Sequence, residues 1–256
     1  MHGHRSVLLL SFGALMHERA TASEVDALRT LYKEMAGAHW YRKSGWLEDG
    51  TDHCTWHGVT CKHASVVGLD LTSNGVEGAL PSALATLTLL RSLRLHGNSL
   101  NGTLPAQMCK SLTHLEELDL SKKNGLSGTL PPQLGMLTRL LRLDLSQNWV
   151  RGTIPSEVGR LSRLRVLKMD SNRLSGTLPA ALQTIPHLST LSFSSNWLSG
   201  TLPSTLSALT ALTEFNLRNN QLSGSVPMQY ENLTHLQRLQ IEDNYVTKTS
   251  ALKTDL

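Results

Sequence analysis

The sequence has no stretch long and apolar enough to cross a membrane. Its most apolar run, from Ser6 to Met16, has 11 residues, which is too short to span a bilayer. A concentrated positive charge is also missing, because 24 basic and 20 acidic residues leave a net charge of +4 that is spread along the chain. We therefore do not expect nucleic-acid binding, which requires a basic face.

Catalytic motifs are missing as well. The sequence contains no Ser/His/Asp constellation, no glycine-rich phosphate-binding loop and no His-Glu-x-x-His motif, and its 11 histidines occur mostly singly. These absences argue against an enzyme, so we expect no catalytic residues and no cofactor. The hydrophobic content of 40% nevertheless predicts an ordered chain with a continuous core.

An internal repeat dominates the chain. Asparagine recurs every 24 residues, with one longer step of 26 residues between Asn98 and Asn124. Each of the first seven asparagines is followed by glycine four residues later and by proline seven residues later. A fixed period of this length predicts a solenoid of stacked coils. The recurring asparagines, which we call the asparagine ladder, are Asn74, Asn98, Asn124, Asn148, Asn172, Asn196, Asn220 and Asn244.

Each repeat also contains a strand signal. Pairs of apolar residues such as Leu143 and Leu145 alternate with polar residues, which is the period of a half-buried strand. Eight such pairs predict eight short parallel strands, one per coil, and therefore an α/β solenoid. Because a carboxamide both donates and accepts hydrogen bonds, we expect the asparagine ladder to satisfy buried backbone groups from coil to coil.

The repeat resembles that of plant-type leucine-rich repeat proteins. The residues from Leu164 to Pro179, LRVLKMDSNRLSGTLP, have the pattern LxxLxLxxNxLxGxLP, and the resemblance covers residues 66–245 as eight coils, the last incomplete. It implies a right-handed superhelix with a concave parallel sheet, a second small strand at Gly-Thr-Leu-Pro, and a ligand on the concave or lateral face. The family includes receptor-kinase ectodomains, co-receptors and secreted polygalacturonase inhibitors.

Residues 23–65 resemble the N-terminal cap of this family. Ser23 to Asp26 is typical of a capping box that opens a helix, which Gly37 would end. Trp40 and Trp46 match the tryptophans of the cap, and Cys54-x-Trp56-x-Gly-Val-x-Cys61 matches its cysteine motif. The resemblance implies a disulfide between Cys54 and Cys61.

Zinc binding is the alternative reading of the same segment. The candidate ligands fit no common zinc module in their spacing, so we expect no metal. They are His53, Cys54, His57, Cys61 and His63.

Several features predict that the protein is secreted or held at the cell surface. Residues 1–22 combine a basic start, a short apolar run and the small residues Ala20-Thr21-Ala22, as in a signal peptide. The alternative is a disordered leader on a cytosolic protein. Asn101 and Asn232 lie in glycosylation sequons. Residues 246–256 lack the glycine and proline of the repeat and are expected to form a C-terminal tail.

The repeat is irregular between Asn98 and Asn124. One extra residue lies in the segment that contains Cys109, which we expect to be a buried free thiol, and the other lies at Lys122-Lys123. Either Lys123 replaces the ladder asparagine or Asn124 reaches that place through a bulge, and we expect a local kink.

The residues that follow the ladder asparagines are the candidate ligand-binding column. Trp149, Arg173 and Trp197 occupy this place in consecutive coils, so the two indoles should flank the guanidinium in a cation–π stack. The alternative is that the indoles fold back and cover core. Further candidates on the strands are Lys168, Asp170, Arg94, His96 and Arg218, beside serines of the sixth coil, Ser189, Ser192, Ser194 and Ser195, which would leave room for a partner.

We interpret the chain as a non-catalytic extracellular module that binds a protein or peptide. A co-receptor and a secreted hydrolase are the partners that the resemblance implies. The alternatives are a polygalacturonase-inhibitor-like protein, a fragment of a receptor-kinase ectodomain, and a structural wall protein.

Overall fold

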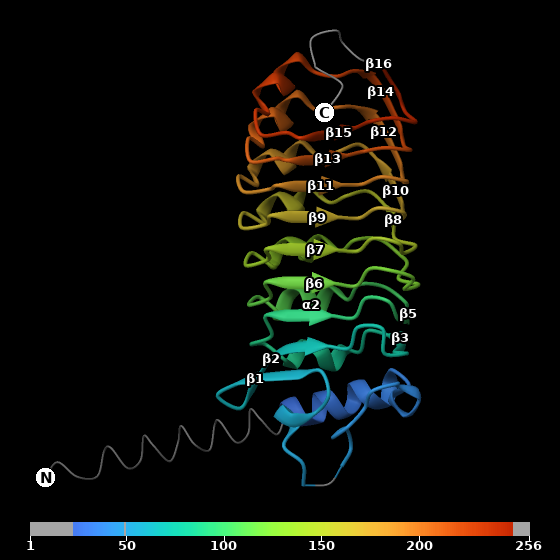
Figure 1. Ribbon diagram of the computed structural model, residues 1–256, viewed down its shortest axis with the longest axis vertical. Helices are drawn as coiled ribbons and strands as arrows, with labels where there is room; N and C mark the ends of the chain where they lie inside the picture. Colours follow the sequence, from blue (N-terminus) through green and yellow to red (C-terminus); the bar gives the residue numbers. More distant parts are fainter. Residues whose placement is uncertain (1–22, 49, 248–256) are drawn as a thin grey trace, which may run out of the picture.

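The computed structural model describes residues 23–48 and 50–247, which form a column of stacked coils capped at the N-terminal end (Figure 1). The predicted signal peptide and all but the first two residues of the predicted tail lie outside the described residues. None of the described helices is long and apolar enough to cross a membrane.

A parallel sheet forms one face of the column. The predicted strands are present, one per coil, each with its central residue turned into the core except at the C-terminal end, where Leu239 is half-buried. A ninth strand, β1 (Val59–Lys62), comes from the cap and pairs antiparallel with the first of them. The eight parallel strands are β2 (Ser65–Asp70), β4 (Ser92–Arg94), β6 (Glu117–Asp119), β7 (Arg142–Asp144), β9 (Val166–Lys168), β11 (Thr190–Ser192), β13 (Glu214–Asn216) and β15 (Arg238–Gln240).

A second set of strands runs along the side of the column, beyond the arrowheads of the first sheet (Figure 1). These strands mostly begin just after a ladder asparagine and end near the following glycine, so they lie earlier in the repeat than the expected Gly-Thr-Leu-Pro. They are β3 (Glu77–Ala79) and β5 (Ser99–Asn101) in one pair, and β8 (Arg151–Gly152), β10 (Arg173–Gly176), β12 (Trp197–Thr201), β14 (Gln221–Ser225) and β16 (Tyr245–Thr247) in a five-stranded sheet. Strand β16 continues the repeat beyond the predicted boundary at residue 245.

Short helices cover the back of each coil. Each begins directly after the recurring proline, whose missing N–H costs nothing at a helix start. Seven are described in the repeats: η3 (Ser82–Thr86), α2 (Ala106–Ser111), η4 (Pro132–Met136), η5 (Ser156–Arg160), η6 (Ala180–Thr184), η7 (Ser204–Ala208) and η8 (Met228–Asn232). The extra residue of the second coil lies in α2, which is an α-helix where the other coils have 3₁₀ turns.

The asparagine ladder joins neighbouring coils. The side-chain amide of Asn148 donates to the carbonyls of Leu145 (3.0 Å) in its own coil and Leu120 (2.9 Å) in the preceding coil, and its Oδ1 accepts from the N–H of Leu126 (3.0 Å). The same pattern recurs from Asn98 to Asn244. At the first coil Arg42 of the cap provides both backbone groups, donating to Asn74 Oδ1 and accepting from its amide.

The irregular third coil keeps the ladder. Asn124 donates to the carbonyls of Leu95 and Leu120 and accepts from the N–H of Leu100, so Lys123 does not replace it. The extra residue is absorbed by two successive left-handed residues, Lys122 (φ 60°) and Lys123 (φ 65°), where coils such as the fourth have a single one.

A continuous leucine-rich core fills the column. Cys109 lies in it as a buried free thiol, as predicted. Burial raises the pKa of Cys109 to about 12, because a thiolate is disfavoured in an apolar environment.

The cap covers the exposed end of this core. Its helix (residues 23–34) buries Leu28 and Leu31, and Met35 directly after it is also buried. The carboxylate of Glu24 accepts a hydrogen bond from the N–H of Val66 (3.1 Å) at β2. The three predicted tryptophans are buried with Tyr32 in one cluster, with adjacent ring centroids 5.0–5.8 Å apart.

The cap helix ends differently from the prediction. Ala36 is the left-handed residue (φ 54°), and Gly37 opens the short turn η1 (Gly37–His39). Gly37 is needed for space, because a Cβ atom there would lie 2.3 Å from the Tyr32 ring.

Candidate ligand-binding surface

The candidate column lies on the side of the molecule, where the chain leaves the parallel sheet and enters the second set of strands. Arg173 opens β10 and its guanidinium carbon lies 4.5 Å from the centre of the Trp149 ring. Trp149 is 57% exposed and Trp197, which opens β12, is 53% exposed. About half of each indole therefore meets solvent, which argues against the alternative that they only cover core.

The predicted sandwich of two indoles around one guanidinium is formed on one side only. In the described part of the chain, Arg173 makes a cation–π contact with Trp149 and with no other ring. Trp197 pairs through its backbone with Ser175, further along β10 than Arg173. The strands β8 and β10 are offset by the same two residues, with Arg173 opposite Arg151, so the register does not distinguish the two indoles. The guanidinium lies over the indole of the preceding coil. Trp197 is therefore a separate exposed aromatic beside the Trp149–Arg173 pair.

Asp170 is held by its neighbours instead of being free for a ligand. Its carboxylate accepts hydrogen bonds from the Ser194 backbone N–H (2.8 Å) and hydroxyl (2.7 Å) and from the Ser192 hydroxyl. Ser146 donates to it from the preceding coil (3.4 Å). These serines of the sixth coil thus satisfy Asp170, whereas the sequence suggested that they leave room for a partner. Lys168 lies in β9, half-buried, and makes no ion pair within the described residues.

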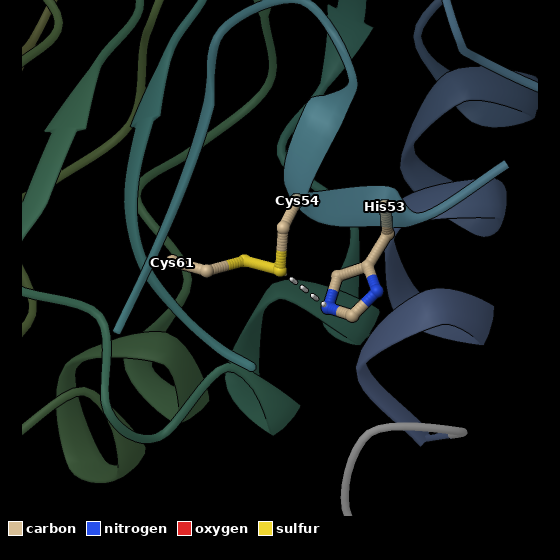
Figure 2. A group of neighbouring side chains, drawn as sticks. All are labelled: His53, Cys54 and Cys61. Atoms are coloured by element: carbon tan, nitrogen blue, oxygen red, sulfur yellow. Dashed lines mark hydrogen bonds between the residues drawn. A yellow bond between two sulfur atoms is a disulfide. The ribbon is translucent and has the colours of Figure 1, made fainter. Parts of the chain in front are cut away.

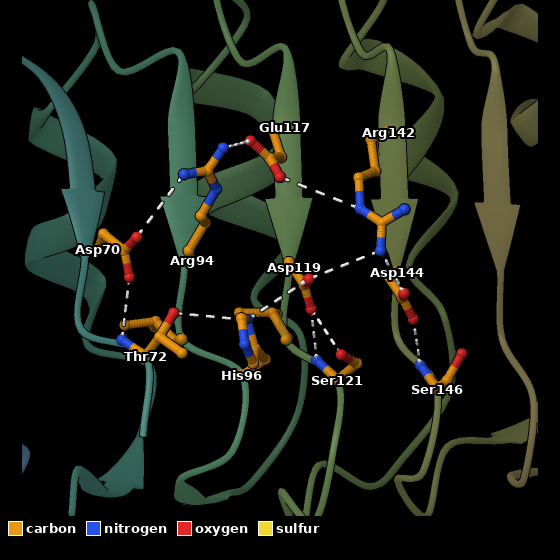
Figure 3. Close-up of polar contacts among 12 residues, drawn as sticks. Asp70, Thr72, Arg94, His96, Glu117, Asp119, Ser121, Arg142, Asp144 and Ser146 are labelled. Atoms are coloured by element: carbon orange, nitrogen blue, oxygen red, sulfur yellow. Dashed lines mark hydrogen bonds and ion pairs between the residues drawn. The ribbon is translucent and has the colours of Figure 1, made fainter. Parts of the chain in front are cut away.

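Arg94 belongs to a network of ion pairs across β2, β4, β6 and β7 (Figure 3). It contacts Glu117 at 2.6 Å and Asp70 at 3.6 Å, and the hydrogen bond to Glu117 raises the pKa of Arg94. Partial burial opposes ionisation of Asp70, but hydrogen bonds from Thr72 and the charge of Arg94 outweigh it and lower the pKa of Asp70. Arg94 is therefore already paired within the sheet.

The same network includes His96 and an arginine that the sequence did not single out. Arg142 reaches Asp144 at 2.7 Å, Asp119 at 3.7 Å and Glu117 at 4.0 Å, while His96 Nδ1 lies 3.5 Å from Asp119 (Figure 3). The aspartates that end β2, β6 and β7 are partners of these cations. Only the register of adjacent coils brings them together.

Arg218 lies far from this network, toward the C-terminal end. Its Nε is 3.0 Å from the carboxylate of Asp243 in the next coil, and both side chains are more than half exposed. An exposed pair of this kind contributes little to stability, because solvent and salt screen the attraction. Arg94, His96 and Arg218 thus lie on separate parts of the molecule from the Trp149–Arg173 pair.

The zinc alternative conflicts with the cysteine chemistry of the cap. Cys54 and Cys61 form a disulfide, and His53 Nε2 lies 3.6 Å from the Cys54 sulfur (Figure 2). These three residues are close enough together to hold an ion, but zinc binds thiolates, which a disulfide does not provide. The pairing that the family resemblance implied is therefore present.

Both sequon asparagines are accessible. Asn101 ends β5 and Asn232 ends η8, and both are exposed. Whether they carry a glycan stays a prediction.

Comparison with known families identifies the two parts of the structure. Residues 21–62 match the leucine rich repeat N-terminal domain, and residues 89–111, 139–161 and 162–222 match leucine rich repeats. Over 134 residues, 49% of this chain, the sequence is 37% identical to receptor-like protein 7 of Arabidopsis thaliana.

Solved structures give the same result. The fold is similar to that of PEPR1 in its structure with AtPEP1, with a TM-score of 0.80 and 32% identity over 88% of this chain. It is also similar to the plant peptide hormone receptor RGFR1 in complex with RGF2, with a TM-score of 0.67 and 32% identity over 68% of this chain. The matched part is 13% of receptor-like protein 7 and 32% and 28% of the two solved chains.

The fold defines a leucine-rich-repeat solenoid whose N-terminal end is closed by a disulfide-bonded cap. The asparagine ladder, the second set of strands and the matched relatives specify the subclass. This chain belongs to the plant-type leucine-rich repeat proteins.

Proposed function

We propose that this chain is a non-catalytic extracellular recognition module that binds a peptide or protein through its lateral face, at Trp149, Arg173 and Trp197. The similar receptor RGFR1 is a peptide hormone receptor solved in complex with RGF2. The disulfide of the cap supports an extracellular location, because disulfides persist in oxidising compartments.

The exposed Trp149–Arg173 pair is the observation that carries the proposal. Tryptophan and arginine are the residues most enriched among binding hot spots. Stacking at 4.5 Å holds the guanidinium over the Trp149 ring and reduces the side-chain entropy that Arg173 would lose on binding. Within the described residues the Arg173 guanidinium makes no ion pair, so its donors can bind carbonyl or carboxylate groups of a ligand. Trp197 offers a second flat apolar surface one coil away.

A peptide-display selection tests this function directly. Peptides would be selected from a random library on the wild-type protein and then measured against Trp149→Ala, Arg173→Ala and Trp197→Ala. Loss of a hot-spot side chain costs about 2 kcal/mol or more, roughly a thirtyfold loss of affinity. We expect such a loss for at least Trp149→Ala and Arg173→Ala.

Tyr245→Ala is the matched control, because Tyr245 occupies the equivalent place in the last described coil and is also exposed. It should leave peptide affinity unchanged. Thermal unfolding of every variant would be measured in parallel. Variants that lose thermal stability but bind the selected peptides normally would show that the aromatic column is structural and would refute the proposal.

A further inference from the structure

The start of the parallel sheet carries a concentration of positive charge, which becomes apparent when the coils are aligned with one another. Four segments precede β4, β6, β7 and β9: residues 86–91, 110–116, 136–141 and 160–165. Together they contain six lysines and arginines but only one acidic residue, Glu116. The corresponding segments of the next three coils (residues 184–189, 208–213 and 232–237) contain neither lysine, arginine nor acid. The six cations are Arg91, Lys110, Arg139, Arg160, Arg163 and Arg165.

A cavity of about 400 Å³ lies at the N-terminal end of this region, between the β1–β2 hairpin and the next three coils. His114 and Arg139 line it from the same place in consecutive coils, each directly before a buried leucine, and Arg163 follows one coil further on. We call this row of residues the basic edge. It consists of Lys62, His63, Arg91, His114, Arg139 and Arg163.

The cations of the basic edge are largely free of internal partners. Within the described residues, only Arg91 makes an ion pair, with Glu116 at 3.0 Å. The nearby Glu117 is already bound by Arg94 and Arg142. Uncompensated charge of one sign on an accessible surface attracts a partner of the opposite sign.

The cavity also has an apolar part. Val67 and Leu89 line it beside Lys62, Arg91 and Arg139, and Leu89 is 42% exposed. A polyanion without apolar groups would contact the cations and leave Leu89 uncovered. A peptide that interleaves acidic and aliphatic side chains would satisfy both.

We propose that the basic edge is a second interaction surface, which binds an acidic peptide segment carrying aliphatic side chains. The basic edge lies where the strands of the parallel sheet begin. The Trp149–Arg173 pair lies beyond the ends of these strands, next to β8 and β10, so the two surfaces are separated by the length of the strands (Figure 1). A ligand can therefore occupy the basic edge without occupying the lateral face, and the two surfaces can be tested separately.

Fluorescence anisotropy with three labelled probes tests the proposal on the full chain. The probes are a short peptide of alternating Glu and Leu, the same peptide with Gln for Glu, and the same peptide with Ser for Leu. Only the Glu/Leu peptide should bind well, and added salt should weaken the binding because screening acts on exposed charges. Polygalacturonate, as an unlabelled competitor, represents the acidic polysaccharides.

The double variant Lys62→Ala/Arg139→Ala should weaken the Glu/Leu peptide about tenfold, which corresponds to about 1.4 kcal/mol for two exposed charges. Arg151→Ala/Arg238→Ala removes the same charge from exposed cations elsewhere and should change affinity less than about twofold. Leu89→Ser should also weaken binding while leaving the net charge unchanged. Circular dichroism and thermal unfolding would show whether each variant is folded. If Lys62→Ala/Arg139→Ala does not fold, the single variant Arg139→Gln takes its place.

Four results would overturn the proposal. Equal losses in the two double variants would mean attraction by net charge alone. Equal binding of the Glu/Ser peptide, or complete displacement by polygalacturonate at matched charge, would assign the basic edge to polyanions in general. No binding of the Glu/Leu peptide would remove the site.

Discussion

Replacing a central ladder asparagine tests the interaction that joins the coils. In Asn148→Ala the buried N–H of Leu126 loses the acceptor that it contacts at 3.0 Å, and no other acceptor for it is found among residues 23–48 and 50–247. A buried donor without a partner costs about 1–3 kcal/mol. The carbonyls of Leu120 and Leu145 each lose one hydrogen bond but keep another, from the amides of Asn124 and Asn172.

Each of the two lost carbonyl hydrogen bonds contributes about 0.5–1.5 kcal/mol, and we take the lower value because each carbonyl keeps its other hydrogen bond. Added to the cost of the unpaired N–H, this gives a total loss of about 2–4 kcal/mol. That is a large part of the 5–15 kcal/mol typical of a folded protein. Urea unfolding followed by circular dichroism measures the change in the free energy of unfolding. Hydrogen exchange at the Leu126 amide should accelerate, which would show that the stability is lost at this position.

Asn244→Ala provides the comparison at the end of the ladder. Asn244 makes the equivalent bonds to the carbonyls of Leu217 and Ile241 and the N–H of Leu222, but it is only half-buried. Water can replace an exposed hydrogen-bonding partner, so this variant should lose less than about 1 kcal/mol. Equal losses in Asn148→Ala and Asn244→Ala would refute the reasoning that burial gives the ladder its value.

Two further predictions concern packing between coils and the buried thiol. Gly200→Ala should destabilise the protein by more than about 1 kcal/mol, because Gly200 has a left-handed backbone (φ 79°) and a Cβ atom there would lie 2.8 Å from the Thr177 methyl. In a Thr177→Ser background the loss should shrink by about 0.5 kcal/mol or more, and an unchanged loss in chemical denaturation would exclude the methyl clash. Because burial holds the pKa of Cys109 at about 12, the folded protein at pH 8 should not react with iodoacetamide, whereas the urea-unfolded protein should, and rapid labelling of the folded chain detected by mass spectrometry would contradict the assigned burial.

The sequence was sufficient to predict the scaffold. The spacing of asparagine, glycine and proline predicted the coils, and the alternation of leucines predicted the eight parallel strands. These features could be predicted because they depend on the spacing of residues within one repeat, and each coil of a solenoid has the same structure as the next. The cap was equally accessible, because its tryptophans and Cys54–Cys61 form a recognisable motif.

The internal partners of the polar surface residues were not predicted. Arg94, His96 and Asp170 were selected as ligand contacts, yet each is engaged by residues from neighbouring coils. Arg142 and the basic edge were missed. Their signal was present in the sequence once it is aligned by coil, because Arg139 and Arg163 then fall in one column.

The sequence by itself determined how the coils form, since hydrophobic alternation and the needs of buried backbone groups act within one repeat or between identical repeats. Only the tertiary structure decided which charges neutralise one another, which are left unpaired, and that Arg173 stacks on Trp149 and not on Trp197. The charge pairings depend on the register of adjacent strands, where a shift of one or two residues changes which side chains meet. The stacking depends on the direction that the Arg173 side chain takes from its strand.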